Sequence, residues 1–588
     1  MGHSGLAVCK YGGSVLRSDD DFALVVHDLY RRVRRGQRVV AVVSALAGTT
    51  DRLLNRARFD GVEQDPHAVA GLVETGEVES VAMLRLALDR VGVPSEALDV
   101  GAISLRSVGE PLNATPIDVD LKRIHRVLEE KCVLVIPGFV GRDQGDRPTL
   151  FGRGGSDLTA LFLAGQLGAD HCRLIKDVDG LYERDPARPG PAPRRYDTMR
   201  WDDVLHLDGS IVQHKAVRFA REQVISFDVG ELLTEGGTRV GPGSSEYASP
   251  RWPNRPLRIV LLGFGTVGQG VYRFAERLSD RLVVVRIATR DLEKAERAGA
   301  ATSLLTDDVF DAVASNCDVV VEAIGGLDPA RAAIESALHM GRHVVTANKA
   351  VVARYGPELH RAAERGKAKL RYSAAVGGGT PILEAVQRIA GESSIESIRA
   401  VLNGTTNVVL DCVSEGKSVD TAIREAKAAG FAEADPHDDL NGLDAAHKLT
   451  LLWHAWTGRW SVPACVDCAG ASLERLTVLQ SDSHEHEVIR QVAQLRRDGD
   501  VIHARVRLER LQPEDPLAGI RREQNAAVIR TIDGDSHVVR GRGAGRFPTA
   551  EAVVADLLDC ADDVPDPVES MEFSVARPSI VPAQAVTC

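Results

Sequence analysis

An aspartate and a lysine in the second half of the chain, Asp444 and Lys448, have the types and the spacing to do chemistry. Residues four apart share one face of a helix, so a helix here would present a carboxylate beside an ammonium group. Reduction of an aldehyde by hydride transfer builds negative charge on the carbonyl oxygen, which a cation or acid must meet. We therefore predict that Lys448 donates the proton. For the pair taken alone, a solvent-exposed ion pair is the alternative interpretation.

A glycine turn lies upstream of this pair, in the segment Leu257–Gly268 (LRIVLLGFGTVG). Six strand residues precede the turn, and a helix is predicted to begin at Gln269. In such a turn the first glycine permits a tight bend, the second lets backbone amides approach a pyrophosphate, and the third lets the helix pack closely on the strand. The predicted dinucleotide-binding residues are Gly263, Phe264, Gly265, Thr266, Val267 and Gly268.

The end of the next predicted strand bears on the choice of dinucleotide. Asp291 would favour NADH by accepting from a ribose hydroxyl, whereas Arg290 would pair with the 2′-phosphate of NADPH. We favour NADPH, with NADH as the alternative. The same residues also fit the surface charges of a helix start.

A second glycine turn lies at the N-terminus, where Val8-Cys9-Lys10-Tyr11-Gly12-Gly13-Ser14 reads as a strand running into a turn. Amides freed by glycine can cradle phosphate oxygens, and a neighbouring lysine can neutralise charge during phosphoryl transfer. The segment is not a Walker loop. Lys10, Gly12, Gly13 and Ser14 form a candidate phosphate-binding group.

The elements that position these residues form two series of short apolar strands alternating with amphipathic helices, which is typical of α/β domains. With 588 residues the chain is too long for one core. A Gly, Pro and Ser-rich stretch separates the two series. We expect a first domain over 1–235, a linker over 236–256, a nucleotide-binding domain over 257–375, a substrate domain over 376–540, a return to the nucleotide-binding domain over 541–562, and a loosely ordered tail over 563–588.

The composition excludes several partners. A formal charge of -12 and few basic runs argue against nucleic acid or an anionic membrane. The basic cluster Arg31–Arg35 (RRVRR) is interpreted as the solvated face of a helix. No stretch reaches the ~18 apolar residues of a membrane span, and no signal region opens the chain, so we expect a cytoplasmic protein.

Four motifs resemble homoserine dehydrogenase in order and spacing: Ala347–Ala350 (ANKA), Ala375–Pro381 (AVGGGTP), Asn403–Asn407 (NGTTN) and Gly430–Lys448. The resemblance covers roughly Leu257 to Asp559 and includes Gly541–Gly545 as a closing cofactor loop. It implies reduction of L-aspartate 4-semialdehyde to L-homoserine. By this resemblance Glu433 and Asp444 bind the substrate, Asp439 supports the site, Lys349 is a second essential lysine near the nicotinamide, and Gly430 and Gly543 contribute to cofactor binding.

One position departs from the family. Where members commonly have a glutamate that belongs to a sodium-binding loop, this chain has Ser373. The backbone carbonyls of Val376 and Gly378 remain candidate ligands for a sodium ion, because such hard cations need only oxygen ligands.

The first half resembles the amino-acid kinase superfamily, and specifically aspartate kinase, over about Leu6 to Phe227. The motifs that carry this resemblance are Val43–Asp51 (VSALAGTTD), Thr75–Glu77 (TGE), Gly152–Asp157 (GRGGSD) and Asp177–Tyr182 (DVDGLY). It implies an α/β/α sandwich for the first half. The resemblance of the second half to homoserine dehydrogenase implies a Rossmann doubly wound domain and an α+β substrate domain.

The same resemblance implies roles for individual residues. Lys10 and Asp157 look like the transfer residues. The implied aspartate-binding set is Thr50, Glu77, Arg153 and Ser156, and the implied MgATP-binding set is Lys10, Gly12, Gly13, Ser14, Lys176, Asp177 and Tyr182. A guanidinium such as Arg153 suits a carboxylate, and Glu77 suits an α-ammonium group.

The nucleotide side departs from aspartate kinases, because Lys176 replaces a threonine and Ile211 a phosphate-pairing lysine. Lys176 or Lys215 could substitute. The paired regulatory ACT domains that usually follow are not expected, since the linker comes almost at once. Two hypotheses remain: a bifunctional enzyme, or an active dehydrogenase whose first domain is a structural or amino-acid-binding module. Both families usually dimerise, so we expect at least a homodimer.

Overall fold

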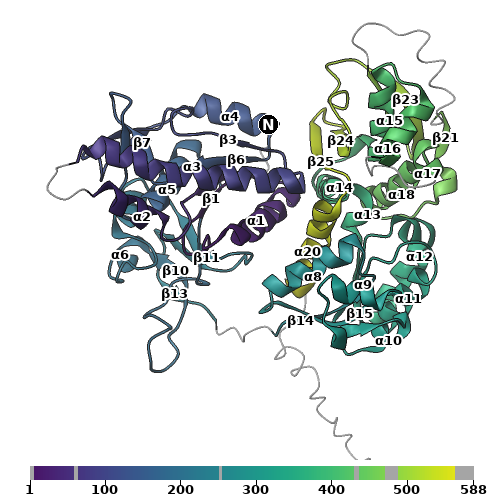
Figure 1. Ribbon diagram of the computed structural model, residues 1–588, viewed down its shortest axis with the longest axis horizontal. Helices are drawn as coiled ribbons and strands as arrows, with labels where there is room; N and C mark the ends of the chain where they lie inside the picture. Colours follow the sequence, from purple (N-terminus) through teal and green to yellow (C-terminus); the bar gives the residue numbers. More distant parts are fainter. Residues whose placement is uncertain (1–4, 59–63, 250–254, 429–435, 471–487, 563–588) are drawn as a thin grey trace, which may run out of the picture.

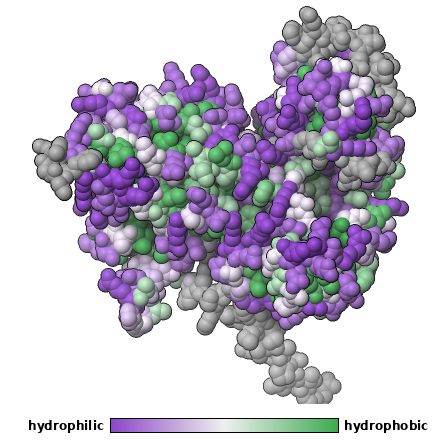
Figure 2. All heavy atoms as spheres, in the orientation of Figure 1, coloured by the Kyte–Doolittle hydropathy of each residue, from purple (hydrophilic) through white to green (hydrophobic). Residues whose placement is uncertain are grey.

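The structure is a computed structural model, and it describes residues 5–58, 64–249, 255–428, 436–470 and 488–562. Figure 1 shows two lobes, the first built by the N-terminal part of the chain and the second by the remainder. Among the described residues no helix is long and apolar enough to cross a membrane. Hydrophilic side chains cover most of the face seen in Figure 2.

The first lobe is built on a nine-stranded sheet in the order β13-β10-β12-β11-β9-β1-β2-β6-β3. Its parallel centre consists of apolar, buried strands, as a sheet covered on both faces requires. These strands are β1 (Leu6–Tyr11), β2 (Arg38–Val43), β6 (Val133–Pro137) and β9 (His171–Lys176). The peripheral strands are β3 (Ser95–Ala97), β10 (Tyr196–Arg200), β11 (Phe227–Glu231), β12 (Thr238–Gly241) and β13 (Glu246–Tyr247).

Helices cover both faces of this sheet. One apolar cluster joins it to α1 (Phe22–Arg34) and the C-terminal part of α3 (Pro66–Val91), and a second joins it to α4 (Leu121–Glu130), α5 (Gly155–Leu167) and α7 (His214–Glu222). A small sheet of β5 (Thr115–Asp118), β4 (Arg106–Val108), β7 (Val140–Arg142) and β8 (Pro148–Leu150) lies beside them. The α/β/α sandwich is confirmed.

The linker prediction begins too early. Residues 238–241 and 246–247 lie in strands β12 and β13, and Thr238 and Val240 are fully buried in the first lobe. Short strands among glycines and prolines carry too little periodicity to be recognised in a sequence. The interval 248–256 between β13 and the next strand leaves no room for an ACT domain.

The second lobe begins with an all-parallel sheet in the order β16-β15-β14-β17-β18-β19. The order reverses between β14 and β17, which is where such sheets bind ligands. Its strands are β14 (Leu257–Leu262), β15 (Leu282–Ala288), β16 (Leu305–Thr306), β17 (Val319–Glu322), β18 (His343–Thr346) and β19 (Leu370–Arg371). Helices α8 (Thr266–Arg277) and α12 (Lys349–Gly366) follow β14 and β18.

The remaining sheet is largely antiparallel, with the order β21-β23-β22-β20-β24-β25. Its strands are β20 (Ile395–Val401), β21 (Asp467–Gly470), β22 (Val488–Asp498), β23 (Val501–Leu511), β24 (Gln524–Thr531) and β25 (Ser536–Arg542). An apolar cluster joins it to α14 (Ile382–Glu392) and α18 (Leu443–Thr457). The last helix, α20 (Arg546–Asp562), returns to the parallel sheet and packs on α8. The Rossmann and α+β predictions are confirmed.

The basic cluster of α1 is not a solvated face, and that prediction is wrong. Arg31 and Arg34 are 4% and 8% exposed, because α1 lies between the lobes and contacts α20 (Figure 1). A single apolar cluster runs from α1 through α8 to α20. The other domain buries these arginines, and a helical periodicity cannot reveal a partner distant in the sequence.

Candidate active sites

The glycine turn after β14 has the backbone that a dinucleotide loop needs. Gly263 has φ +101°, and a Cβ there would lie 2.4 Å from the Ala323 carbonyl oxygen. A Cβ on Gly268 would lie 2.2 Å from the Gly263 oxygen, so only glycine lets α8 approach this closely. Nothing lies within 4 Å of the corresponding position on Gly265, which leaves room at the N-terminus of α8. The helix begins at Thr266, three positions earlier than predicted.

A buried glutamate organises the neighbouring strand ends. Glu322, at the end of β17, accepts hydrogen bonds from the amides of Ile324 and Gly325 and from the Thr346 hydroxyl. Asn348 caps α12 by accepting from the Val351 amide. Lys349 is thus the first residue of α12, at the same edge of the sheet as the glycine turn.

Lys349 meets the predicted catalytic pair. The Asp444 carboxylate lies 2.8 Å from the Lys448 ammonium and 3.0 Å from that of Lys349. Lys448 also donates to the Leu402 carbonyl oxygen at 2.6 Å. Asp444 and Lys448 are buried, so the interpretation as an exposed ion pair is wrong.

The electrostatics keep Asp444 ionised. Burial opposes its charge, but the two ammonium groups outweigh that penalty and hold the pKa of Asp444 well below its usual range. The pKa of His447 is lowered by burial, which favours its neutral form. The cluster therefore offers fixed positive charge around one permanent carboxylate.

Asn403 was missed as a positioning residue. Its amide nitrogen donates to Asp439 at 2.7 Å and to Asp444 at 2.8 Å, while its oxygen caps α15 (Gly404–Ser414) by accepting from Thr406. An Asn followed by Gly-Thr-Thr is a helix-capping signal that could have revealed it. Glu433 and Gly430 lie outside the described residues.

The predicted closing loop packs on the glycine segment after α13 (Ser373–Gly377). Gly378 has φ +58°, and a Cβ there would lie 2.3 Å from the Gly543 carbonyl oxygen. The Gly379 amide donates to the Arg542 carbonyl oxygen at 3.1 Å. The two segments therefore form one layer, and any larger residue at position 378 would separate them.

At the predicted 2′-phosphate position, the Asp291 carboxylate caps α9 (Leu292–Arg297) by accepting from the Lys294 amide at 2.9 Å. Arg290 is exposed. The cap occupies only Oδ1, and a carboxylate accepts at both oxygens, so the preference for NADPH stays a prediction.

The first lobe has its own lysine and aspartate cluster. Asp157, near the start of α5, lies 2.8 Å from both the Lys10 and the Lys176 ammonium groups. All three side chains are buried. Against the opposing effect of burial, the two lysines lower the pKa of Asp157 to about 2. Burial lowers the pKa of Lys176 to about 8, although Asp157 opposes that shift.

Glu77 lies in α3 and is 1% exposed. Burial raises its pKa to about 8, although the Ala45 amide and Lys10 both oppose the rise. Its Oε2 atom has no hydrogen-bond partner among the described residues. A buried carboxyl oxygen without a partner is ready for an ammonium group. Ser156 accepts from the Ser44 hydroxyl at 2.8 Å.

The other predicted kinase residues surround this cluster less tightly. Thr50 is half-buried in α2 (Thr49–Ala57), and Arg153 is exposed in the turn before α5. Gly12, Gly13 and Ser14 follow β1, and a Cβ on Gly12 would lie 2.2 Å from the Lys10 ammonium. Asp177 is exposed, and Tyr182 donates to Asp179.

Lys215 donates to the carbonyl oxygens of residues 113, 114 and 151. It therefore holds a loop in place and does not take the place of the lysine missing at position 211.

Comparisons with known proteins give the family. Residues 381–558 match homoserine dehydrogenase, residues 263–373 match its NAD-binding domain, and residues 5–229 match the amino acid kinase family. Homoserine dehydrogenases of Synechocystis sp. and Corynebacterium glutamicum are each 35% identical, over 52% and 53% of this chain and 73% of each relative. The chain belongs to the homoserine dehydrogenase family. A crystal structure of the Thiobacillus denitrificans enzyme is 35% identical with a TM-score of 0.49, and it covers 53% of this chain and 76% of that one.

The resemblances to homoserine dehydrogenase and to the amino acid kinase superfamily are therefore confirmed, while the narrower resemblance to aspartate kinase stays a prediction. One chain joins an amino acid kinase domain to a homoserine dehydrogenase with an NAD(P)-binding domain. The assignments of individual residues remain predictions.

Position 373 of this homoserine dehydrogenase does not offer a ligand for sodium. The Ser373 hydroxyl donates to Asp556 at 2.8 Å and accepts from the Arg34 guanidinium at 2.8 Å. A guanidinium beside this position disfavours a second cation. The carbonyls of Val376 and Gly378 stay candidate ligands.

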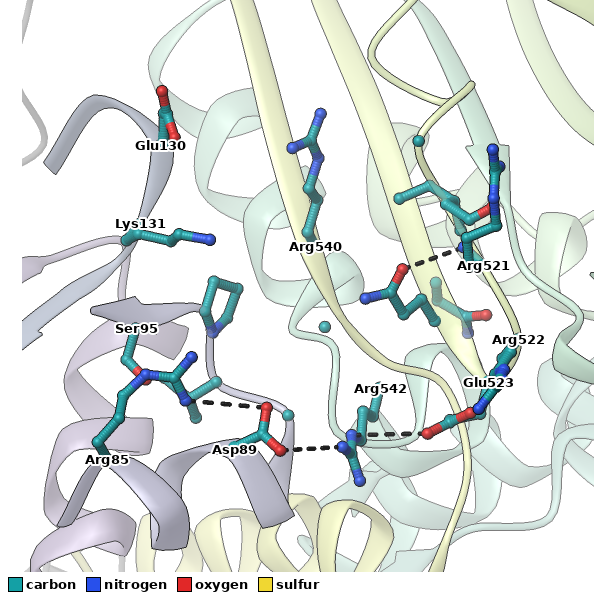
Figure 3. A pocket seen from close by; sticks show the side chains of 18 residues that line it. Arg85, Asp89, Ser95, Glu130, Lys131, Arg521, Arg522, Glu523, Arg540 and Arg542 are labelled. Atoms are coloured by element: carbon teal, nitrogen blue, oxygen red, sulfur yellow. Dashed lines mark hydrogen bonds and ion pairs between the residues drawn. The ribbon is translucent and has the colours of Figure 1, made fainter. Parts of the chain in front are cut away.

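A cavity of about 330 Å³ separates the two domains near the closing loop. Figure 3 shows Asp89, from α3, and Glu523 reaching Arg542 from opposite sides. The charged residues that line the cavity are mostly basic. They are Arg85, Lys131, Arg521, Arg522, Arg540 and Arg542, against Asp89, Glu130 and Glu523. A Cβ on Gly92, which directly follows α3, would lie 2.8 Å from the Arg542 amide nitrogen. The first domain thus touches the residue next to Gly543.

Proposed function

We propose that the second half reduces L-aspartate 4-semialdehyde to L-homoserine with NADPH, and that Lys448 protonates the carbonyl oxygen. The observation that carries this proposal is the buried Asp444 held between Lys448 and Lys349. NADPH, when bound, supplies the hydride. Lys448 has the geometry to donate a proton, since its ammonium is fixed by the Leu402 carbonyl and by Asp444. Asp444 orients that ammonium and is available to a substrate polar group.

We further propose that the first domain phosphorylates the β-carboxylate of L-aspartate with MgATP. The carrying observation is the buried Lys10, Asp157 and Lys176 cluster. MgATP, when bound, supplies the phosphoryl group. Lys10 and Lys176 can offset negative charge during its transfer, and Glu77 can hold the α-ammonium of the acceptor. A separate semialdehyde dehydrogenase would perform the step between the two reactions, and we expect the whole enzyme to form a homodimer.

The alternative is a first domain that serves as a structural or amino-acid-binding module and transfers no phosphate. The loss of a phosphate-pairing lysine at Ile211 favours it. The intact Lys10 and Asp157 pair favours transfer, and so does Lys176, which brings a second cation to the same carboxylate.

Two assays on the full chain test these proposals. The first follows NADP⁺ and NAD⁺ reduction by L-homoserine, and the second follows aspartate-dependent ADP release at saturating MgATP. Asp157→Asn should abolish ADP release and spare homoserine oxidation, while Lys448→Ala should do the reverse. Wild-type protein without aspartate-dependent ADP release would leave only the alternative of a structural or amino-acid-binding module.

A further inference from the structure

The first domain inserts a charged side chain into the dehydrogenase half. Arg34, the last residue of α1, donates to Glu384 of α14 and to Ser373 of α13, both at 2.8 Å. It also pairs with Asp556 of α20. One guanidinium therefore joins three dehydrogenase elements, although more than 300 residues of chain separate it from each of them.

Asp556 depends on this contact. It is fully buried and accepts from the amide and hydroxyl of Ser373, and within the described chain Arg34 is the cation with which it pairs. A buried carboxylate that loses its cation is strongly disfavoured. The position of α13 relative to α20 is therefore set by a residue of the kinase-like domain.

Helix α13 leads directly to the active site. It contacts α18, which carries Asp444 and Lys448, and it ends at Gly377, beside the Gly378 backbone that packs on Gly543. A displacement of α13 would move the glycine layer relative to Lys448. Misplacement of reacting groups by about 1 Å can cost a hundredfold in rate.

We propose that Arg34 is a positioning residue for the dehydrogenase reaction, supplied by the first domain through Ser373 and Asp556. It touches neither substrate nor cofactor. The first domain thus completes the dehydrogenase, whether or not it transfers phosphate. The inference rests on the dehydrogenase function, so an inactive wild-type chain would refute that function, whereas an active wild type with an equally active Arg34 variant would refute only this inference.

The test compares homoserine oxidation by the full-length Arg34→Ala, Arg34→Lys and wild-type chains. We expect kcat to fall about ten- to a hundredfold in Arg34→Ala, with cofactor affinity changed less than about threefold because the Gly263 turn is built by other elements. Dilute guanidinium chloride, far below denaturing concentrations, should restore part of the lost kcat by refilling the vacated site. Arg34→Lys should lie between, since it keeps the charge without the fork.

Arg35→Ala is the matched control. Its side chain is 44% exposed, and its guanidinium lies 3.6 Å from the Asp559 carboxylate, so we expect less than a twofold change in kcat and no effect of added guanidinium. Equal losses in the two variants, or a loss in Arg34→Ala that guanidinium cannot restore, would overturn the proposal.

Ser373→Ala decides the matter if Arg34→Ala does not fold. It breaks the contact to α13 but leaves Arg34 paired with Asp556 and Glu384. We expect a several-fold lower kcat that guanidinium does not restore. Wild-type kcat in Ser373→Ala would show that Arg34 does not act through α13.

Discussion

Both halves of the molecule hold a buried aspartate between two lysines, but they differ in how far the second lysine is enclosed. Asp157 lies between Lys10 and Lys176, and Asp444 between Lys448 and Lys349. The Lys176 side chain is 10% exposed, whereas that of Lys349 is 42% exposed. The kinase-like cluster is closed on itself, and the dehydrogenase cluster opens at one lysine.

This difference matches the two reactions. Phosphoryl transfer needs concentrated positive charge in a dry site, because electrostatic stabilisation weakens in water. Hydride transfer to an aldehyde needs one fixed donor and an open side for a cofactor and a substrate. The similar clusters therefore predict unlike responses when a lysine is removed or the pH is raised.

The largest expected effect follows removal of the enclosed lysine of the dehydrogenase. Lys448→Ala should lower kcat for semialdehyde reduction about 10²- to 10⁴-fold, the usual contribution of a positioned acid. NADPH affinity, measured by fluorescence titration, should change little. The control is Lys122→Ala, which removes an exposed lysine of α4. A near-normal kcat in Lys448→Ala would contradict the proton-donor assignment.

The second effect concerns pH in the kinase-like site. The pKa of Lys176, lowered to about 8 by burial, means that its charge is present below pH 8 and is lost as the pH rises through that value. If this charge assists transfer, kcat for aspartate-dependent ADP release should fall about tenfold per pH unit above 8. It should be measured at saturating aspartate, where the substrate ammonium already favours ionised Glu77.

Lys176→Arg is the matched variant, because a guanidinium keeps its charge throughout this range. In this variant the fall in kcat above pH 8 should disappear, even if its maximal rate is lower. An unchanged fall in kcat near pH 8 in Lys176→Arg would assign the titration to another group.

Local features of both sites were predictable, and contacts between distant segments were not. The strand, bend and helix around Gly263 follow one another in a short segment, so they could be placed to within three positions. Asp444 and Lys448 were paired by helical spacing, but their burial depends on the packing of α18 against α12, α14 and β22, which a four-residue spacing cannot include. Arg34 was misplaced for the same reason, since its partners lie on α13, α14 and α20.

A smaller effect is expected on proton release in the first domain. The pKa of Glu77, raised to about 8 by burial, leaves it mostly protonated at pH 7 in the free protein. An α-ammonium group at Oε2 would favour the carboxylate, so aspartate binding should release about one proton at pH 7. Calorimetry in two buffers of different ionisation enthalpy measures this number. Glu77→Gln should release no proton. Equal proton release by both proteins would show that Glu77 does not bind the ammonium group.

The smallest effect should be on stability at the open end of the dehydrogenase cluster. Because the Lys349 side chain is 42% exposed, water screens its pairing with Asp444, and Lys349→Met should change the free energy of unfolding by less than about 1 kcal/mol. Lys448→Met removes the enclosed partner of a buried carboxylate and should cost about 3–5 kcal/mol. Denaturant titrations followed by the fluorescence of Trp453 and Trp456 in α18 compare the two variants directly. If both lysines cost the same, Lys349 is as enclosed as Lys448, and the open side of the dehydrogenase site must be sought elsewhere than at Lys349.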